Sequence, residues 1–440
     1  MIVMKFGGSS VESATAIQRV AGIVKSFQAR QPIVVVSAMG KTTNRLLEVA
    51  NLAVSGKKDA ALGKLEELRA YHHAEADAFG AAEIIDEHFN ELAELARGLA
   101  ILGELTPRSV DAISSFGERI SSRVVALALG ADHLDSRAVV ITDERHTMAI
   151  PNYAETNDRL AAIKWGPLTV MGGFIGSTLA GVTSTLGRGG SDFTASIVGA
   201  GVNAEEIQIW TDVDGMLTCD PTVLPGGRRV KSISFAEAAE LAYFGAKVLH
   251  PSTVLPAIEK NIPVLILNSR RPEVDGTRIT AQGPVSKSVA KSIACKKHIT
   301  LVNIQSTRMF LAHGFLRRIF EVFDRHETPV DMIATSEVSV SLTIDDNSAL
   351  DAITTELRDF AEVDTENTMA IVCLVGDNIR WQPGVAHRVF RALDPINVRM
   401  ISQGASLRNI SIVVAQQQLR DAVERLHTEF FTDVDPEVFE

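Results

Sequence analysis

The chain has 440 residues, 46% of them hydrophobic and 22% charged, and a net charge of −11. At roughly 150 residues per domain, this length predicts about three domains with large aliphatic cores, which excludes a disordered chain. The acidic balance excludes a surface for nucleic acid or an anionic membrane, because such surfaces need a basic excess. Three cysteines without a CxxC pair, and no apolar run near 18 residues, predict a reduced cytosolic protein with no disulfide framework or protein-held metal.

The first elements in chain order predict the start of a parallel α/β sheet. An apolar run at 2–6 ends in the glycine-rich turn 7–10, and a helical pattern occupies 17–27. A continuous β-branched run at 33–36 follows, as in a strand that is buried on both faces. Strand, glycine-rich turn, helix and strand is the order of a parallel α/β unit.

The next part of the chain extends the same architecture. The pattern is mostly helical over 46–129, with a break near 103–107. Strand-like runs then alternate with helices; the runs are 138–142, 168–174, 207–211 and 264–268, and the helices are 192–200 and 235–249. We therefore expect residues 1–283 to form one doubly wound, mainly parallel α/β domain.

The character of the sequence changes after Gln282-Gly283-Pro284. Residues 299–345 predict the order strand, helix, strand, strand, and residues 369–415 repeat it. Such units bury little surface alone and usually pack side by side. We therefore expect two β-α-β-β copies in the C-terminal part.

Three glycine-rich turns lie where predicted strands meet helices, at 5–10, 172–176 and 187–192. Glycine lets a ligand approach the backbone, and helix N-termini favour anions. One such turn is usually only a turn, but three at the ligand-binding edge of one sheet indicate an anion site. Gly40-Lys41-Thr42 lacks the first glycine of a Walker A loop, because position 35 is Val, and no G-x-G-x-x-G follows a strand.

An anion site for phosphoryl transfer needs cations, because that chemistry depends on positioning and charge stabilisation. Lys5 at the end of the first strand is one candidate, and Lys247 is another. Taken alone, Lys247 fits a surface helix lysine better than a catalytic group.

Seven segments together resemble the aspartate kinases of the amino-acid kinase family, from one end of the chain to the other. They are KFGGSSV (5–11), VSAMGKTTN (36–44), SFGE (115–118), GGFIG (172–176), TLGRGGSD (185–192), WTDVDG (210–215) and FGAKVLHP (244–251). The resemblance implies the amino-acid kinase fold and phosphorylation of the β-carboxylate of L-aspartate by ATP, with Mg²⁺ held mainly by the ATP. The product would be 4-phospho-L-aspartate, in the first step of lysine, threonine and methionine biosynthesis.

The resemblance also implies roles for single residues. Lys5 and Lys247 would bind the phosphates and stabilise the in-line transition state, with Asp192 orienting both lysines. Arg188 would hold the α-carboxylate of the substrate with its bidentate fork, and Glu118 would bind the α-ammonium. Further residues carried over are Ser37, Thr43 and Ser191 for the substrate, and Gly7, Gly8, Ser9, Thr211 and Asp212 for the nucleotide. Without the full pattern, Glu118 would be expected on a solvated helix face and Asp192 as a simple N-terminal helix carboxylate.

One stretch departs from the family pattern. Leu217 stands where a tyrosine is expected and Thr222 where an arginine is expected, and both expected side chains would line the nucleotide site. This departure keeps two alternatives open. One is a kinase for another small acidic amino acid, and the other is a non-catalytic amino-acid sensor that has lost nucleotide binding.

The C-terminal copies resemble paired ACT domains, expected at 299–366 and 367–440, with 293–304 as an alternative part of the second. Their sequence is similar to the effector region of lysine-sensitive aspartate kinases, although Ala312 and Pro329 replace common serines. By position, the effector site would consist of Met309, Phe315, Leu316, Asp331, Ser336 and Glu337. Because ACT pairs dock onto those of another chain, the resemblance implies a homodimer or larger oligomer, and the length implies a monofunctional enzyme.

Overall fold

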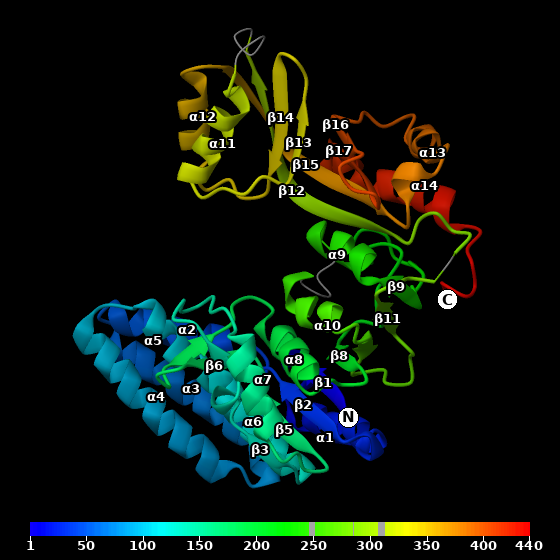
Figure 1. The fold of residues 1–440 in the computed structure, drawn as a ribbon. Helices are drawn as coiled ribbons and strands as arrows, with labels where there is room; N and C mark the ends of the chain where they lie inside the picture. The colour runs from blue at the N-terminus through cyan, green and yellow to red at the C-terminus, as the bar shows by residue number, and fades with distance from the viewer. Residues whose placement is uncertain (246–250, 285, 307–312) are drawn as a thin grey trace. The chain divides into compact units, whose positions relative to one another are not determined.

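The computed structural model describes residues 1–245, 251–284, 286–306 and 313–440 (Figure 1). The chain divides into two compact units, Met1–Met216 with Val248–Gly283 and Leu217–Lys247 with Pro284–Glu440. By its contacts, the stretch that begins at Leu217 is grouped with the C-terminal part, and the domain boundary expected at 283 stays a prediction. No helix of the described residues is long and apolar enough to cross a membrane.

The first unit contains a mainly parallel sheet with strands in the order β3-β5-β2-β1-β8-β10-β11. The strands are β1 (Ile2–Phe6), β2 (Pro32–Val36), β3 (Asp132–Leu134), β5 (Thr169–Gly172), β8 (Ile207–Thr211), β10 (Val264–Asn268) and β11 (Thr277–Thr280). β11 runs antiparallel to β10, while the other neighbours pair in parallel. The strands expected near 2–6, 33–36, 207–211 and 264–268 are confirmed.

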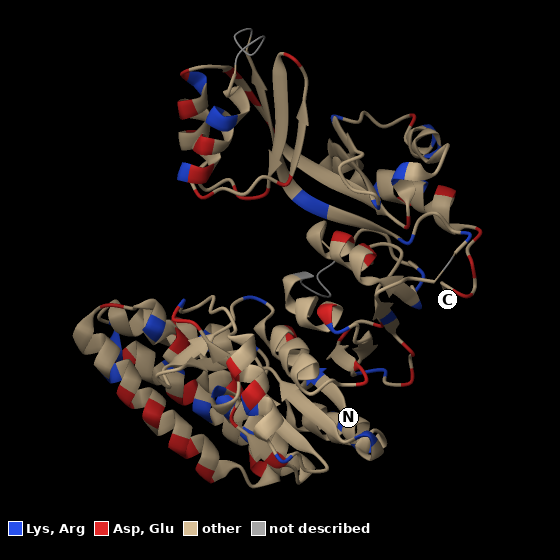
Figure 2. Cartoon of the chain, in the orientation of Figure 1, with Lys and Arg blue, Asp and Glu red and all other residues tan. Residues whose placement is uncertain are grey.

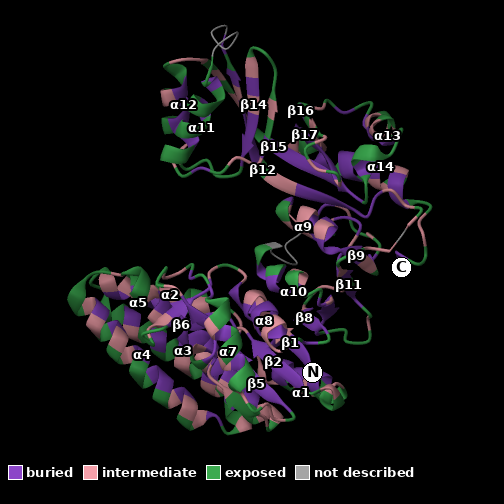
Figure 3. Cartoon of the chain, in the orientation of Figure 1, coloured by how far each residue is buried: buried purple, intermediate pink, exposed green. Residues whose placement is uncertain are grey.

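Helices lie on both faces of this sheet (Figure 1). They are α1 (Ala14–Ser26), α2 (Thr42–Val54), α3 (Lys58–Ala76), α4 (Ala82–Leu102), α5 (Pro107–Ser114), α6 (Phe116–Leu129), α7 (Tyr153–Ala162), α8 (Gly190–Gly201) and α10 (Leu255–Glu259). Of these, α3 and α4 form a further helical layer on one side (Figure 1). The expected break near 103–107 is confirmed, because Gly103 ends α4 at a positive φ of 70° and Thr106 caps α5. Figure 3 shows buried strands between helices whose outer sides are exposed.

Two predicted elements differ from the structure. The run at 138–142 is a strand only at β4 (Ile141–Thr142), because residues 136–138 form a 3-10 turn capped by Asp135. Strand β4 belongs to a small sheet with β6 (Ile175–Thr178) and β7 (Thr183–Thr185). The helix expected at 235–249 is α9 (Phe235–Tyr243), which begins with a capping box at Ser234 and ends at its cap Phe244.

The second unit is built on a six-stranded sheet in the order β13-β14-β12-β15-β17-β16, preceded by β9 (Ser232–Ser234) and α9. The strands are β12 (Ser292–Gln305), β13 (Met332–Thr335), β14 (Ser339–Ile344), β15 (Glu362–Val375), β16 (Met400–Gln403) and β17 (Asn409–Ala415). The helices are α11 (Phe315–Arg325), α12 (Leu350–Arg358), α13 (Val385–Ala392) and α14 (Leu419–Phe431). The two β-α-β-β copies are therefore confirmed.

The two copies share their central strands. β12 and β15 have 14 residues each and pair along most of their length, from Ser292↔Val375 to Gln305↔Glu362. The C-terminal half of β12 also pairs with β14 of the first copy, and the C-terminal half of β15 pairs with β17 of the second. Figure 2 shows most charged residues of this unit on its helices and loops, with few on the strands.

Candidate functional site

Strand alternation directs Lys5 toward helix α8. Ile2, Met4 and Phe6 of β1 belong to the core that also contains α1 and α6, so Lys5 points to the opposite face. Helix α8 packs on that face and carries Asp192 in its first turn. Lys5 Nζ lies 2.6 Å from Asp192 Oδ1, with only 11% and 16% of the two side chains exposed. The structure thus brings these two predicted residues together as a mostly buried ion pair.

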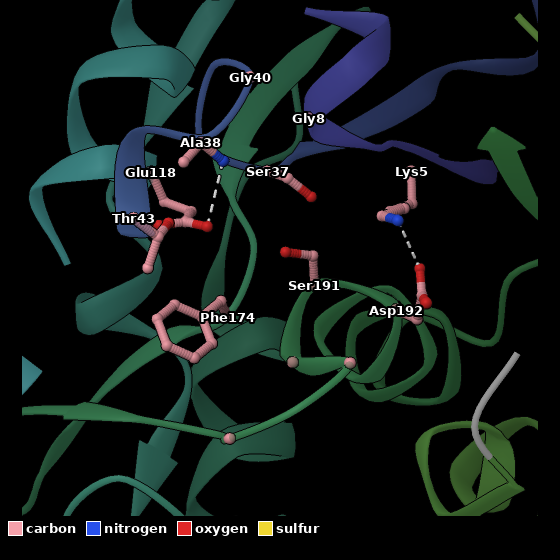
Figure 4. Close-up of a pocket in the computed structure, with 13 residues that line it drawn as sticks. Lys5, Gly8, Ser37, Ala38, Gly40, Thr43, Glu118, Phe174, Ser191 and Asp192 are labelled. Carbon is pink, nitrogen blue, oxygen red and sulfur yellow. Dashed lines mark hydrogen bonds and ion pairs between the residues drawn. The ribbon is translucent and has the colours of Figure 1, made fainter. Parts of the chain in front are cut away.

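A cavity of ≈ 320 Å³ lies beside this ion pair (Figure 4). Its lining includes these predicted residues: Lys5, Gly8, Ser37, Thr43, Glu118, Ser191 and Asp192. In Figure 4, Ser37 and Ser191 reach into the space between Lys5 and Glu118. The cavity therefore has a cationic end at Lys5 and a carboxyl end at Glu118, with hydroxyl groups between them.

Glu118 is buried in the first turn of α6 and is only 4% exposed. Its Oε1 accepts a 3.1 Å hydrogen bond from the backbone N–H of Ala38, and Oε2 has no hydrogen-bond partner among the described residues. Burial raises the pKa of Glu118 to about 8. The alternative of a solvated helix face is therefore wrong, and the site holds a carboxyl group that a cationic ligand would stabilise.

The glycine-rich turn after β1 packs tightly against the turn after β2. Gly8 O accepts a hydrogen bond of 3.0 Å from Gly40 N. A Cβ at Gly8 would lie 2.8 Å from Gly40 O, so a larger residue would force these backbones apart. The turn consequently keeps its backbone close to the cavity.

The nucleotide candidates lie at the carboxyl ends of neighbouring strands. Gly7 N donates to Trp210 O over 3.2 Å, which places the turn that contains Gly7 at the carboxyl end of β8, where Thr211 and Asp212 follow. Thr211 is partly exposed and Asp212 is exposed. Ligands of open α/β sheets bind at this edge of the sheet, so the structure brings this group of predicted residues to one place.

Arg188 is exposed and lies between Gly187 and Gly189, both of which line the cavity. Its side chain forms no ion pair with the described residues. Phe174, which the sequence reasoning missed, also lines the cavity. It has a positive φ of 64°, uncommon outside glycine, and its N–H donates to Thr194 Oγ1 over 2.9 Å. The signal for it was its place inside the motif 172–176.

Two predicted residues lie outside the described part of the chain, Lys247 and Met309. The two departures from the family pattern belong to the second unit. There Leu217 O accepts a hydrogen bond from Ser292 Oγ at 2.7 Å, and Thr222 donates to Asp220 over 2.7 Å. Their expected place at the nucleotide site stays a prediction.

Three of the predicted effector residues flank strand β13. Asp331 precedes the strand, and Ser336 and Glu337 follow it, so Asp331 and Ser336 are separated by ~16 Å at about 3.3 Å per residue. Ser336 and Glu337 are exposed. At the start of α11, Phe315 is buried and Leu316 is 40% exposed.

Asp331 already has an ammonium partner within the chain. Lys296 Nζ lies 2.6 Å from Asp331 and 2.7 Å from Asp345. Burial raises the pKa of Asp331, and the Lys296 ammonium opposes this effect. The carboxylates at this end of β13 therefore suit an ammonium group, and Lys296 supplies one.

The comparisons with known proteins agree with this architecture. The sequence model of the "Amino acid kinase family" matches residues 1–268, and that of the "ACT domain" matches residues 302–355 and 372–430. Aspartokinase 3, chloroplastic, of Arabidopsis thaliana is 40% identical over 455 residues, covering 98% of this chain and 81% of the plant protein. Lysine-sensitive aspartokinase 3 of Escherichia coli K12 is 36% identical, covering 98% of this chain and 99% of the relative.

Solved structures give the same result. The structure of E. coli aspartokinase III in complex with lysine and aspartate matches with a TM-score of 0.84 at 35% identity, covering 98% of this chain and 99% of that chain. The structure of the same enzyme with aspartate and ADP matches with a TM-score of 0.83 at 35% identity, covering 98% and 100% of the two chains. The chain therefore belongs to the aspartokinases of the amino acid kinase family, with a C-terminal ACT region.

Proposed function

We propose that the chain transfers the γ-phosphoryl group of ATP to the β-carboxylate of L-aspartate, giving ADP and 4-phospho-L-aspartate. The observation that carries the proposal is the Lys5–Asp192 ion pair in the wall of a cavity whose other end holds Glu118. The aspartate and ADP bound to the E. coli relative support the choice of substrates.

The chemistry requires positioning and charge stabilisation. A β-carboxylate oxygen of aspartate attacks the γ-phosphorus, the bond to the bridging oxygen breaks, and that oxygen leaves on ADP with the electron pair. No proton transfer is needed, because both the nucleophile and the leaving group are anions. Lys5 would stabilise the charge on the transferring group, and Asp192, 2.6 Å from Lys5 Nζ, would orient its ammonium group.

The nucleotide phosphates would lie along the carboxyl ends of β1 and β8. Gly7, Gly8 and Ser9 would donate to them, Thr211 and Asp212 would contact the nucleotide, and Lys247 would supply a second cation. Mg²⁺ would arrive on ATP and neutralise phosphate charge, because Mg²⁺ keeps waters and uses few protein ligands. Phosphate oxygens of ATP would supply most of its ligands.

The substrate would span the cavity from Glu118 toward Lys5. Glu118 would bind the α-ammonium, a cation that stabilises the ionised form of a buried carboxyl. Arg188 would bind the α-carboxylate from the adjacent loop, and Ser37, Thr43 and Ser191 would place the rest of the molecule. This arrangement favours an α-amino acid with a second carboxylate at the cationic end.

Regulation would act through the ACT region, at residues 299–366 and 367–440. Lysine is the proposed effector, supported by the name of the E. coli relative and by the ammonium-binding carboxylates Asp331 and Asp345. An effector inhibits only if it binds two conformations with different affinity. The proposed compartment is the cytosol, in keeping with three buried free thiols.

We also propose a homodimer or larger oligomer formed through the ACT region. β13 and β16 are the edge strands of the six-stranded sheet. Each carries an exposed isoleucine at its second position, Ile333 at 36% and Ile401 at 45% exposure. An edge strand has unpaired backbone groups that a second chain can satisfy.

A coupled assay of ADP release tests the proposed activity. The protein should release ADP with MgATP and aspartate, and less with glutamate or N-acetylglutamate, and added lysine should inhibit it more than threonine does. No ADP release with aspartate would contradict the proposal. Calorimetric titration with MgATP would then identify a sensor, since a sensor that has lost the nucleotide site gives no heat of binding.

A further inference from the structure

A fully buried carboxylate outside the cavity organises the loops next to Arg188. Asp111 of α5 is 0% exposed. Its oxygens accept hydrogen bonds from Thr185 Oγ1 at 2.6 Å and His146 Nδ1 at 2.7 Å. They also accept the backbone N–H of Thr147, at 3.0 and 3.1 Å. A buried carboxylate is stable only when such donors surround it.

The side-chain and backbone donors come from the end of β7, which leads to Arg188 along the chain, and from residues 146–147. Thr185 ends β7 and precedes residues 186–190, which we call the Arg188 loop. Thr147 belongs to residues 143–150, which we call the supporting loop. Ala149 N donates to Thr185 O over 2.9 Å, so the supporting loop and the end of β7 are joined by the backbone as well as by Asp111.

The supporting loop also contacts the Arg188 loop directly. A Cβ at Gly187 would lie 3.1 Å from Thr147 O, and Gly187 immediately precedes Arg188. Thr147 has a positive φ of 72°, a conformation that a β-branched residue rarely adopts. The hydrogen bonds from Thr147 N to Asp111 hold it there, so the carboxylate fixes the surface against which Gly187 packs.

Arg188 itself has no ion-pair partner among the described residues. The position of its guanidinium group therefore depends on the backbone conformation of the Arg188 loop. We propose that Asp111 is a positioning residue that, through Thr185 and Thr147, holds the Arg188 loop in the conformation that binds the substrate α-carboxylate. This inference rests on the proposed function, because it assigns the effect to aspartate binding.

Steady-state kinetics of Asp111→Asn and Thr185→Val test the proposal. Each substitution removes part of the hydrogen bonding at Asp111 and should raise KM for aspartate about tenfold, with kcat and KM for MgATP within about twofold of wild type. Thr156→Val is a matched control, because Thr156 is also a buried threonine but hydrogen-bonds Ile141. It should lower the melting temperature and leave KM for aspartate unchanged.

A double-mutant cycle separates positioning from general destabilisation. In an Arg188→Ala background, Asp111→Asn should raise KM for aspartate by less than about threefold, because the group that it positions is gone. A full tenfold effect in that background would overturn the proposal, as would an unchanged KM in both single variants. If Asp111→Asn does not fold, Thr185→Val decides the question by the same cycle. An inactive wild-type protein would contradict the proposed function instead.

Discussion

The backbone N–H of Ala38 donates a 3.1 Å hydrogen bond to one oxygen of Glu118, and the other oxygen has no hydrogen-bond partner among the described residues. With its pKa raised to about 8 by burial, Glu118 is mostly protonated at pH 7 in the free enzyme. We expect kcat/KM for aspartate to rise from pH 7 to 9, because only the ionised form attracts the α-ammonium. A pH–rate series measures this, and Glu118→Gln should lower the value about 100-fold or more and flatten the profile. A flat wild-type profile would contradict the assignment.

Ionisation of Glu118 should lower the stability of the fold as the pH rises, whereas it should raise kcat/KM. Its pKa in the folded state exceeds the ordinary value of 4.5, so the folded state binds this proton more strongly than the unfolded state. The stabilisation is complete below pH 4.5 and is lost as the pH rises through about 8. Thermal unfolding should therefore show Glu118→Gln gaining melting temperature relative to wild type between pH 5 and 8. An equal difference at both pH values would contradict the pKa shift.

Replacement of Lys5 should abolish phosphoryl transfer without unfolding the chain. Lys5→Met removes the cation next to Asp192, and kcat should fall about 10³-fold or more. Lys5→Arg, which keeps the charge, should retain more activity. Lys25→Met is the control, since Lys25 is an exposed lysine of α1. Circular dichroism and coupled kinetics measure both properties, and near-normal turnover of folded Lys5→Met would contradict its role.

Lys296 should compete with the effector for Asp331. Lys296→Met removes the ammonium that lies 2.6 Å from Asp331, so lysine should inhibit at about tenfold lower concentration, a difference of ~1.4 kcal/mol. The unpaired carboxylates should also lower the melting temperature. Lys297→Met is the control, because Lys297 is the next residue on β12 and forms no ion pair with the described residues. Unchanged or weaker inhibition in Lys296→Met would count against an ammonium-binding role for Asp331.

Charges on the two edge strands should disrupt the proposed oligomer. Ile333→Lys with Ile401→Lys places an ammonium group on both β13 and β16. Pairing of these strands with a second chain would then bring like charges together and remove them from water, which costs free energy. Sedimentation equilibrium should show a lower mass than for wild type. Ile101→Lys on α4 is the control, because Ile101 is 84% exposed but lies in the first unit. A mass unchanged by the double substitution would contradict this interface.

Local patterns predicted much of the fold and of the cavity. The run at 2–6 predicted β1. Because side chains alternate along this strand between its two faces, Lys5 points to the face where α8 carries Asp192. The paired copies were visible because each repeats one order of elements. The helix expected to reach 249 failed for a local reason, since Phe244 caps α9 and Gly245 has a positive φ of 116°.

Properties that depend on distant contacts could not be predicted from single motifs. Glu118 is buried because Gly172, more than fifty residues later, allows close packing: a Cβ there would lie 3.1 Å from Glu118 O. Asp111 carried no signal, because its partners lie 35 to 74 positions away. The ammonium partner of Asp331 was likewise hidden, since Lys296 is on another strand.

The sharing of β12 and β15 makes the two ACT copies one mechanical body. Each long strand contributes hydrogen bonds to both copies, so separating the copies would break the pairing between β12 and β15. A truncation before β15 would leave β12 without its central partner. A perturbation of either central strand is therefore expected to affect both repeats, because each strand is hydrogen-bonded within both.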